Sequence, residues 1–460
     1  MGHKRRPFLL SLKALLKKGG IASLAVKLTN TAMVFGISVL LARTLGADGF
    51  GIYSFVLAMV QILVLPAAVG LPQLVVRETA KAGVRKDWGR LRGLWQWASR
   101  SSLIFSLIMI VVLTGIAKLM SLIGEEGRAS TLLAGALLIP FVALGRLRDG
   151  ALRGLGKVII GQVSDMIIRP LLLIIFVFSL VTTNFYPLSA TVAMALNVSA
   201  AACAFLFGAF LLRRATPVHL SENPTPDLDK SGWWAAAIPL GMMAGLNMIN
   251  QHADILLLGV FRPDDEVGVY RVAVQAAMLV AFGLHAIEMV VIPQFARLYA
   301  SENFASLQRL VTVSARLTSL LAIPIVVVYW VLGERFLSLI FGDEFAIGYL
   351  AMSILAAGQL MNALFGSVKA ILNMGGCERE SMRAMMWGVG INLTLNIILV
   401  PPFGGNGAAI ATAASVVFWN ARLWVVARRR VGIDTLAIPV SRPSTRGGKF
   451  MSQRPGQGGS

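Results

Sequence analysis

Charged residues are scarce in this sequence of 460 residues. Asp, Glu, Lys and Arg together make up 14%, whereas hydrophobic residues make up 56%. A soluble globular protein carries about 25% charged residues. A water-soluble fold of this length could not cover so much apolar surface, but a lipid bilayer can accept it. The composition therefore excludes an ordinary soluble domain and predicts an all-α polytopic membrane protein.

Acidic residues are scarcer than basic ones, with 22 Asp and Glu against 42 Lys and Arg, which gives a net charge of +20. Such a charge would indicate a nucleic-acid partner if the basic residues formed one soluble patch. They lie instead in short clusters between long apolar runs, where they set the orientation of the spans. We therefore expect no nucleic-acid partner.

Cysteine and histidine are nearly absent, with two and four residues respectively. Cys203 and Cys377 offer neither a disulfide framework nor a zinc site. The sequence also lacks HExxH, GxSxG, P-loop and CxxC motifs, which typify metalloproteases, hydrolases, nucleotide-binding proteins and thiol chemistry. We expect no catalytic residues, no enzyme activity, no metal and no cofactor.

About twelve apolar runs approach the roughly 20 residues that a helix needs to cross a bilayer. The predicted spans are 20–43, 51–72, 100–121, 129–146, 157–182, 188–212, 232–260, 267–293, 310–333, 346–368, 382–401 and 406–427.

The positive-inside rule gives an orientation for these spans. With the N-terminus in the cytoplasm, about 34 of the 42 basic residues fall on the inside and about five on the outside. We therefore expect a multi-pass protein of the cytoplasmic (inner) membrane with both termini in the cytoplasm. Arg43, Lys118, Arg128, Arg262 and Arg335 are the predicted outside residues.

The longest inside connection divides the predicted spans into two sets of six. The expected organisation is an amphipathic basic N-terminus at 1–19, an N-lobe at 20–212, a cytoplasmic linker at 213–231, a C-lobe at 232–428 and a disordered basic tail at 429–460.

The two halves contain a weak internal repeat at a shift of about 217 residues. Asn30 then matches Asn247, while Gly51 and Tyr53 of FGIY match Gly268 and Tyr270 of VGVY. Because each half holds an even number of spans, the repeat is parallel. Parallel repeats are typical of transporters in which the substrate path lies between two lobes. The predicted fold is therefore two parallel six-helix lobes around a central cavity.

Several spans carry polar residues at membrane depth, where charges are costly and usually face a cavity or a partner. The candidate substrate-binding residues are Lys27, Asn30, Arg169 and Asn247, and the candidate ion-coupling residues are Asp165 and Asp254. The alternative for the amides is interhelical hydrogen bonding.

Four polar residues also have local interpretations. Asp165 and Arg169 are four residues apart and can pair with each other on one helix. Arg271 lies near the outer end of its span, where snorkelling would explain it. The Asn197 sequon lies at membrane depth and is not a glycosylation site.

Four segments resemble conserved stretches of the polysaccharide-biosynthesis flippases, within the multidrug/oligosaccharidyl-lipid/polysaccharide exporter superfamily. They are LGADGFGIYSFVLAMVQILVLPAAVGLPQLVVRETAKAG, ADILLLGVFRPDDEVGVYRVA, LNMGGCERES and VPPFGGNGAAIATAAS. The resemblance implies a flippase that moves a lipid-linked oligosaccharide, on an undecaprenyl-diphosphate carrier, from the inner to the outer leaflet by alternating access. It also implies membrane lipids, a coupling H⁺ or Na⁺ and glycan-assembly proteins as partners.

Two other functions stay open at this point. An ion-coupled multidrug exporter of the same superfamily would need a cavity carboxylate for organic cations, and Lys27 with Arg169 argues against it. A membrane glycan polymerase or ligase would need a sizeable outer loop, which the predicted spans do not leave. The related peptidoglycan-precursor flippases usually carry about fourteen spans, which the count does not match.

Overall fold

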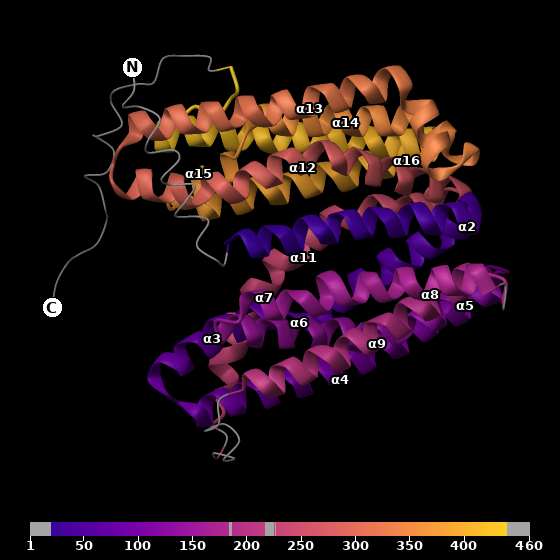
Figure 1. Cartoon of the computed structure of the whole chain (residues 1–460), viewed down its shortest axis with the longest axis horizontal. Coiled ribbons are helices and arrows are strands. Elements are labelled where there is room, and N and C mark those ends of the chain that lie inside the picture. Colours follow the sequence, from indigo (N-terminus) through magenta and orange to yellow (C-terminus); the bar gives the residue numbers. More distant parts are fainter. Residues whose placement is uncertain (1–19, 184–185, 217–224, 226, 439–460) are drawn as a thin grey trace. The chain divides into compact units, whose positions relative to one another are not determined.

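The computed structural model describes residues 20–183, 186–216, 225 and 227–438, and every regular element in these ranges is a helix (Figure 1). The predicted amphipathic segment 1–19 and residues 439–460 of the predicted tail lie outside the described residues.

The described helices fall into two compact units. Unit 1 comprises the described residues of Met1–Val272 together with Ser338–Phe345, and unit 2 comprises those of Ala273–Leu337 and Ala346–Ser460. The predicted boundary at 213–231 stays a prediction.

Unit 1 begins with a long kinked helix and continues through the first turns of α12. Its helices are α2 (Gly20–Ala68), α3 (Leu71–Arg85), α4 (Trp88–Leu122), α5 (Glu126–Ala136), α6 (Leu138–Gly154), α7 (Val158–Val163), η1 (Ser164–Ile168), α8 (Arg169–Thr183), α9 (Ala190–Ala215), α11 (Lys230–Phe261) and the start of α12 (Asp264–Ala300).

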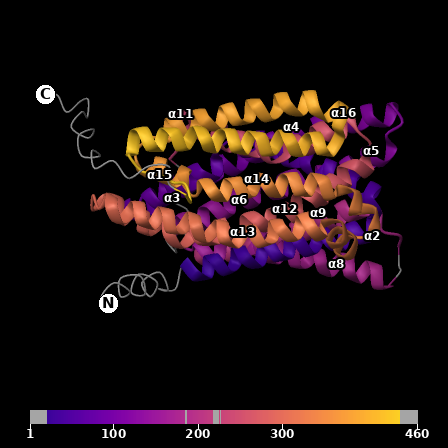
Figure 2. The same ribbon diagram turned by 90° about the horizontal axis from the view of Figure 1, so that it is seen from above.

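Unit 2 holds the rest of α12 and the helices that follow it, which run lengthwise beside one another in both views (Figures 1 and 2). They are α13 (Phe304–Phe341), η2 (Asp343–Gly348), α14 (Tyr349–Phe365), α15 (Val368–Met374), α16 (Glu378–Val426) and η3 (Ala427–Val431). The last turn of α13 and the first residues of η2 belong to unit 1.

The predicted number of spans agrees with the helices. Among the described residues, nine helical segments are long and apolar enough to cross a membrane. Two of these hold 44 and 54 residues, about twice the 20 that one crossing requires, and each is kinked at a glycine, Gly46 or Gly404. The 32-residue helix α11 is also long enough to cross. Counting each kinked segment as two crossings and adding α11 gives twelve.

The sequence repeat places two glycines in direct contact within unit 1. A Cβ atom on Gly51 would lie 1.7 Å from the carbonyl oxygen of Asp264, and one on Gly268 would lie 2.1 Å from that of Ala47. Asp264 precedes Gly268 by four residues, as Ala47 precedes Gly51, so the two contacts are reciprocal. Glycine is required at both positions because α2 and α12 approach backbone to backbone.

A buried ion pair lies beside this contact. Arg128 of α5 was predicted in an outside loop, but its guanidinium is 2.8 Å from the carboxylate of Asp264, and both side chains are about nine-tenths buried. The Arg128 guanidinium also lies 4.9 Å from the centre of the Phe55 ring. The ion pair thus ties α5 to the first turn of α12.

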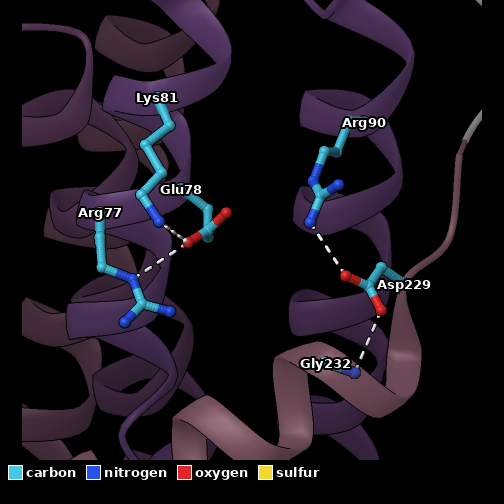
Figure 3. A network of polar contacts seen from close by, with 6 residues as sticks. All are labelled: Arg77, Glu78, Lys81, Arg90, Asp229 and Gly232. Atoms are coloured by element: carbon cyan, nitrogen blue, oxygen red, sulfur yellow. Dashed lines mark hydrogen bonds and ion pairs between the residues drawn. The ribbon is translucent and has the colours of Figure 1, made fainter. Parts of the chain in front are cut away.

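At the opposite end of unit 1, one set of ion pairs lies within α3 and another joins α4 to the start of α11 (Figure 3). Glu78 accepts hydrogen bonds from Arg77 and Lys81, both at 3.0 Å. Arg90 binds Asp229 at 2.9 Å, and Asp229 also caps α11 through the N–H of Gly232. Burial would raise the pKa of Glu78, but Lys81 and Arg77 together lower that pKa below its usual value.

In unit 2 the chain after α16 forms a packed segment, residues 432–438, which we call the strap. These residues lie inside the region 429–460 that the sequence predicts as a tail. Gln308 of α13 binds both backbone groups of Asp434, donating to its carbonyl oxygen at 2.6 Å and accepting from its N–H at 2.8 Å. Arg316 donates to the carbonyl oxygen of Ala437 at 2.9 Å. The buried residues of the strap are Ile433, Asp434, Thr435 and Ala437.

We predict that Gly51→Ala destabilises the protein strongly, because the new methyl group would overlap the Asp264 carbonyl oxygen. Overpacking of this kind costs about 1–3 kcal/mol and sometimes more. The melting temperature in detergent should fall accordingly. Gly115→Ala is the matched control, since nothing lies within 4 Å of its added methyl group. Equal melting temperatures for the two variants would contradict the contact.

We also predict that Gln308→Ala weakens unit 2. The substitution leaves the buried N–H and carbonyl of Asp434 without the Gln308 amide, a loss of about 1–3 kcal/mol for each group. Thermal unfolding should show the loss, whereas Arg309→Ala, at the exposed neighbouring position, should leave stability within about 0.5 kcal/mol. If the strap contributes nothing to stability, Gln308→Ala and Arg309→Ala will give the same melting curve.

Candidate functional site

A cavity of about 220 Å³ lies within unit 1 and gathers the polar residues of several helices. Its wall comes from both halves of α2, from η1, α8 and α9, and from the start of α12. Three of the predicted site residues line it. The polar lining residues are Asn30, Ser38, Tyr53, Ser54, Asp165, Arg169, Asn197 and Arg271.

Arg169 is held in this cavity by a chain of hydrogen bonds. Its Nε and Nη2 atoms donate to Oδ1 of Asn197 at 3.3 and 3.0 Å. The amide of Asn197 in turn donates to the hydroxyl of Tyr53 at 2.8 Å. Asn197 and Tyr53 are 3% and 4% exposed. These hydrogen bonds link α8, α9 and α2, and they orient the Arg169 guanidinium without neutralising its charge.

The helix is locally widened just before Arg169. Residues 164–168 form the π-helical turn η1, and the N–H of Arg169 binds the carbonyl oxygen of Ser164, five residues earlier. Pro170 follows directly and has no N–H to donate to the preceding turn. The proline therefore accounts for the local break in the α-helical hydrogen bonds, and π turns of this kind are frequent at functional sites.

Asp165 lies on the π turn and is the carboxylate of the cavity wall. A Cβ atom on Gly145 would be 3.5 Å from its Oδ2 atom, so α6 packs closely against it. Asp165 and Arg169 do not form the ion pair that their spacing allows, because the guanidinium turns towards Asn197. With Arg169 and Arg271 opposite one carboxylate, the cavity wall carries a net positive charge.

The other candidates lie elsewhere in unit 1. Lys27 and Asn247 are exposed, and the Asn247 amide donates to the Met243 carbonyl of its own helix. Asp254 is buried and accepts a hydrogen bond from the Tyr270 hydroxyl at 3.1 Å. None of these three lines the cavity, so their roles stay predictions.

Sequence reasoning missed five of the eight polar residues of the cavity, and two of them, Arg271 and Asn197, were interpreted in another way. Arg271 was expected to snorkel, but α12 begins at Asp264 and places Arg271 two turns inside the helix. Asn197 was considered only as a sequon, yet it connects Arg169 to Tyr53. The match of Tyr53 with Tyr270 was the one available signal, since it placed Arg271 directly after a repeated tyrosine.

The chain belongs to the family described as polysaccharide biosynthesis proteins, which matches residues 16–299. The MatE family also matches residues 239–398. The family and superfamily that the sequence resembles are thereby confirmed.

Curated relatives carry flippase and transporter names. The "Probable low-salt glycan biosynthesis flippase Agl15" of Haloferax volcanii is 28% identical over 165 residues, which cover 35% of this chain and 34% of that protein. The "Putative O-antigen transporter" of Shigella flexneri is 23% identical over 398 residues, 82% of this chain and 89% of that protein. The chain thus matches about a third of the length of the Haloferax relative.

Solved transporter structures share the fold. The inward closed "Lipid II flippase MurJ" superposes with a TM-score of 0.70 at 12% identity and covers 89% of this chain and 87% of that one. An inward-facing MATE family transporter of the MOP superfamily superposes with a TM-score of 0.69 at 15% identity, covering 90% and 98%. The predicted all-helical, two-lobe membrane fold is therefore confirmed.

We predict that Asn197→Ala destabilises unit 1, because it leaves the buried Arg169 guanidinium without its acceptor and Tyr53 without its donor. Loss of a buried hydrogen-bond partner costs about 1–3 kcal/mol. The melting temperature in detergent is the measurement, and Ser199→Ala, at an exposed position on the same helix, is the control. An unchanged melting temperature for Asn197→Ala would show that the chain of hydrogen bonds is not formed.

Proposed function

We propose that this protein is a flippase that moves a lipid-linked oligosaccharide on an undecaprenyl-diphosphate carrier from the inner to the outer leaflet by alternating access. The observation that carries the proposal is the cavity with two arginines, Arg169 and Arg271, and one carboxylate, Asp165. Guanidinium groups bind phosphate oxygens in a bidentate manner and keep their charge in a low-dielectric site. A diphosphate is the part of the proposed substrate that such a cavity suits.

Arg169 is available for an anion because its hydrogen-bond partner is neutral. Arg169 donates to an amide oxygen, and Arg146 nearby also donates to an amide oxygen, that of Gln61, at 3.0 Å. A carboxylate partner would have cancelled the charge, whereas an amide only orients it. In this proposal Asn30, which lines the same cavity, hydrogen-bonds the substrate.

The family and the relatives' names support the same class of function. Family membership covers more than half of the chain, and the named Haloferax and Shigella relatives are a glycan biosynthesis flippase and an O-antigen transporter. These names describe those proteins, and we extend the activity to this chain as a proposal. We further propose an inner-membrane location with both termini in the cytoplasm, and transport rather than enzyme activity.

We propose Asp165 and Asp254 as ion-coupling residues. Asp165 faces the cavity beside the arginines, so a bound H⁺ or Na⁺ would change the charge that the substrate meets. Asp254 is buried against the Tyr270 hydroxyl and belongs to the helix that repeats α2. Membrane lipids and glycan-assembly proteins are the other proposed partners.

A multidrug exporter of the same superfamily is the second candidate, and the MatE match over residues 239–398 favours it. Such an exporter needs a carboxylate to bind organic cations. Asp165 could serve, but the two arginines beside it would repel a cation. The charge of the cavity therefore favours the flippase.

We predict that Arg169→Gln and Arg271→Gln each slow transport at least about tenfold, since one charge-assisted hydrogen bond to phosphate contributes about 1.5–3 kcal/mol. The measurement is protection of a labelled lipid-linked oligosaccharide from a membrane-impermeant reagent in proteoliposomes. Arg335→Gln, which removes an exposed arginine outside the cavity, should transport normally.

Two results would overturn this function. Wild-type transport rates by both arginine variants would remove the cavity from the mechanism. Export of organic cations by active protein that moves no lipid-linked oligosaccharide would establish the multidrug exporter instead.

A further inference from the structure

A second cavity, of about 320 Å³, lies in unit 1 and shares no lining residue with the first. Its wall comes from α3, α4, α6 and α9. Helices α4 and α9 each pack along α6 but make few contacts with each other. The cavity occupies the space between α4 and α9 beside α6. Its volume lies at the lower end of the roughly 300–1,000 Å³ of ligand pockets.

The wall of this cavity contains a buried arginine that forms no ion pair with any described side chain. Arg148 of α6 is 5% exposed. Its Nη1 atom donates to the Phe205 carbonyl oxygen at 2.7 Å, but its Nε and Nη2 atoms have no hydrogen-bond partner. Asp149, next in sequence, pairs with Arg153 at 3.1 Å instead. The Asp165 carboxylate lies near Arg148, since a Cβ atom on Gly145 would be 3.5 Å from its Oδ2 atom and 3.9 Å from the Arg148 Nη2 atom, but the two form no ion pair. A buried guanidinium without an ion-pair partner is costly, so its position calls for an explanation.

The fold makes room for this guanidinium. A Cβ atom on Gly208 of α9 would lie 2.2 Å from the Arg148 Cζ atom, so any other residue at 208 would displace the arginine. The Phe205 ring lies 5.4 Å from Cζ on the same helix. Gly208 and Phe205 thus hold the Arg148 guanidinium at a fixed position in the wall of the cavity.

The rest of the wall suits an amphiphilic anion. Its twelve residues include a second arginine, Arg213, and no Asp or Glu. Trp95 lines the cavity with its indole N–H already bound to the Thr79 hydroxyl at 3.0 Å. Most of the remaining lining residues are apolar, namely Val75, Ala98, Leu144, Leu147, Ala151, Ala209 and Leu212.

The cavity also lies where a membrane lipid could reach it. Arg148 is in the second-last turn of α6 and Arg213 in the last turn of α9, and span ends lie near the lipid head groups. The outer faces of α4 and α9 beside the cavity are apolar and exposed, with Leu103, Leu206 and Phe210 43%, 67% and 48% exposed. Basic pockets between transmembrane helices are known to bind anionic lipid head groups.

We propose that this cavity binds an anionic membrane lipid, with its phosphate at Arg148 and Arg213 and the first part of one hydrocarbon chain along the apolar wall. The site does not depend on which substrate the first cavity transports. A bound lipid would supply an ion-pair partner for Arg148 and fill the space between α4 and α9. It would therefore stabilise unit 1.

The test uses the purified full-length protein in detergent and native mass spectrometry with titrated lipids. Phosphatidylglycerol should bind, and diacylglycerol with the same acyl chains, which lacks the phosphate, should bind at least about tenfold more weakly. Inorganic phosphate should not compete at millimolar concentration, because it lacks the chain. A polyprenyl phosphate that binds more tightly than phosphatidylglycerol would support the site and identify the preferred chain.

Three variants test whether phosphatidylglycerol binding depends on this cavity. Arg148→Gln should weaken phosphatidylglycerol binding at least about tenfold, the size expected for one charge-assisted hydrogen bond. Ala209→Phe should weaken binding similarly by filling the apolar part while leaving both arginines in place. Arg214→Gln is the matched control, because Arg214 is exposed, stacks on Phe210 and does not line the cavity; its affinity should stay within about twofold.

If Arg148→Gln does not fold, Ala209→Phe and Arg214→Gln still decide the question. Phosphatidylglycerol binding that is equal in wild type and Ala209→Phe would overturn the proposal. Equal binding of diacylglycerol and phosphatidylglycerol would also overturn it, since the arginines would then have no role.

Discussion

The close approach of α2 and α12 at Gly51 and Gly268 is the constraint on which unit 1 depends. Backbone meets backbone there, and each glycine faces the carbonyl oxygen four residues before the other. Tyr53 and Tyr270 follow two residues after these glycines. The contact therefore also positions the two tyrosine hydroxyl groups that bind Asn197 and Asp254. Because the first cavity takes part of its wall from both helices, its shape depends on this contact. A side chain of any size there would separate Tyr53 from Arg271.

Three arginines of unit 1 share an unusual kind of partner. Arg146, Arg148 and Arg169 each donate to a neutral oxygen, from Gln61, from the Phe205 backbone and from Asn197. Neutral acceptors orient a guanidinium and leave its charge in place, whereas the carboxylate of Asp264 neutralises Arg128. The first arrangement occurs beside the two cavities and the second at a helix junction. The choice of acceptor thus distinguishes these three arginines, which keep the charge that our proposals require, from Arg128, which holds two helices together.

Much of the fold follows from the sequence because run length alone locates a helix in a bilayer. The spans and the match of Gly51 with Gly268 in the repeat were predicted, whereas the kinks at Gly46 and Gly404 and the backbone contact of α2 with α12 come from the structure. The depth of individual arginines could not, because it depends on where each helix begins and ends. Arg148 was assigned to an inside connection starting at residue 146, but α6 continues to Gly154 and buries it. Asn197 likewise became a partner of Arg169 only through the packing of α8 on α9.

The π turn before Arg169 has a consequence for evolution and for engineering. A π turn holds one residue more than the α-helical register would, and each residue in an α-helix turns the chain by about 100°. Removal of a single residue from 164–168 would therefore close the π turn into a regular α-helical turn and leave the face that α8 turns towards the cavity nearly unchanged. Removal of one residue from the regular helix α7 would instead rotate α8 about its axis by roughly that angle and turn the side chain of Arg169 away from the cavity. The segment 164–168 is thus the place where this span can lose a residue and still keep Arg169 in the cavity wall.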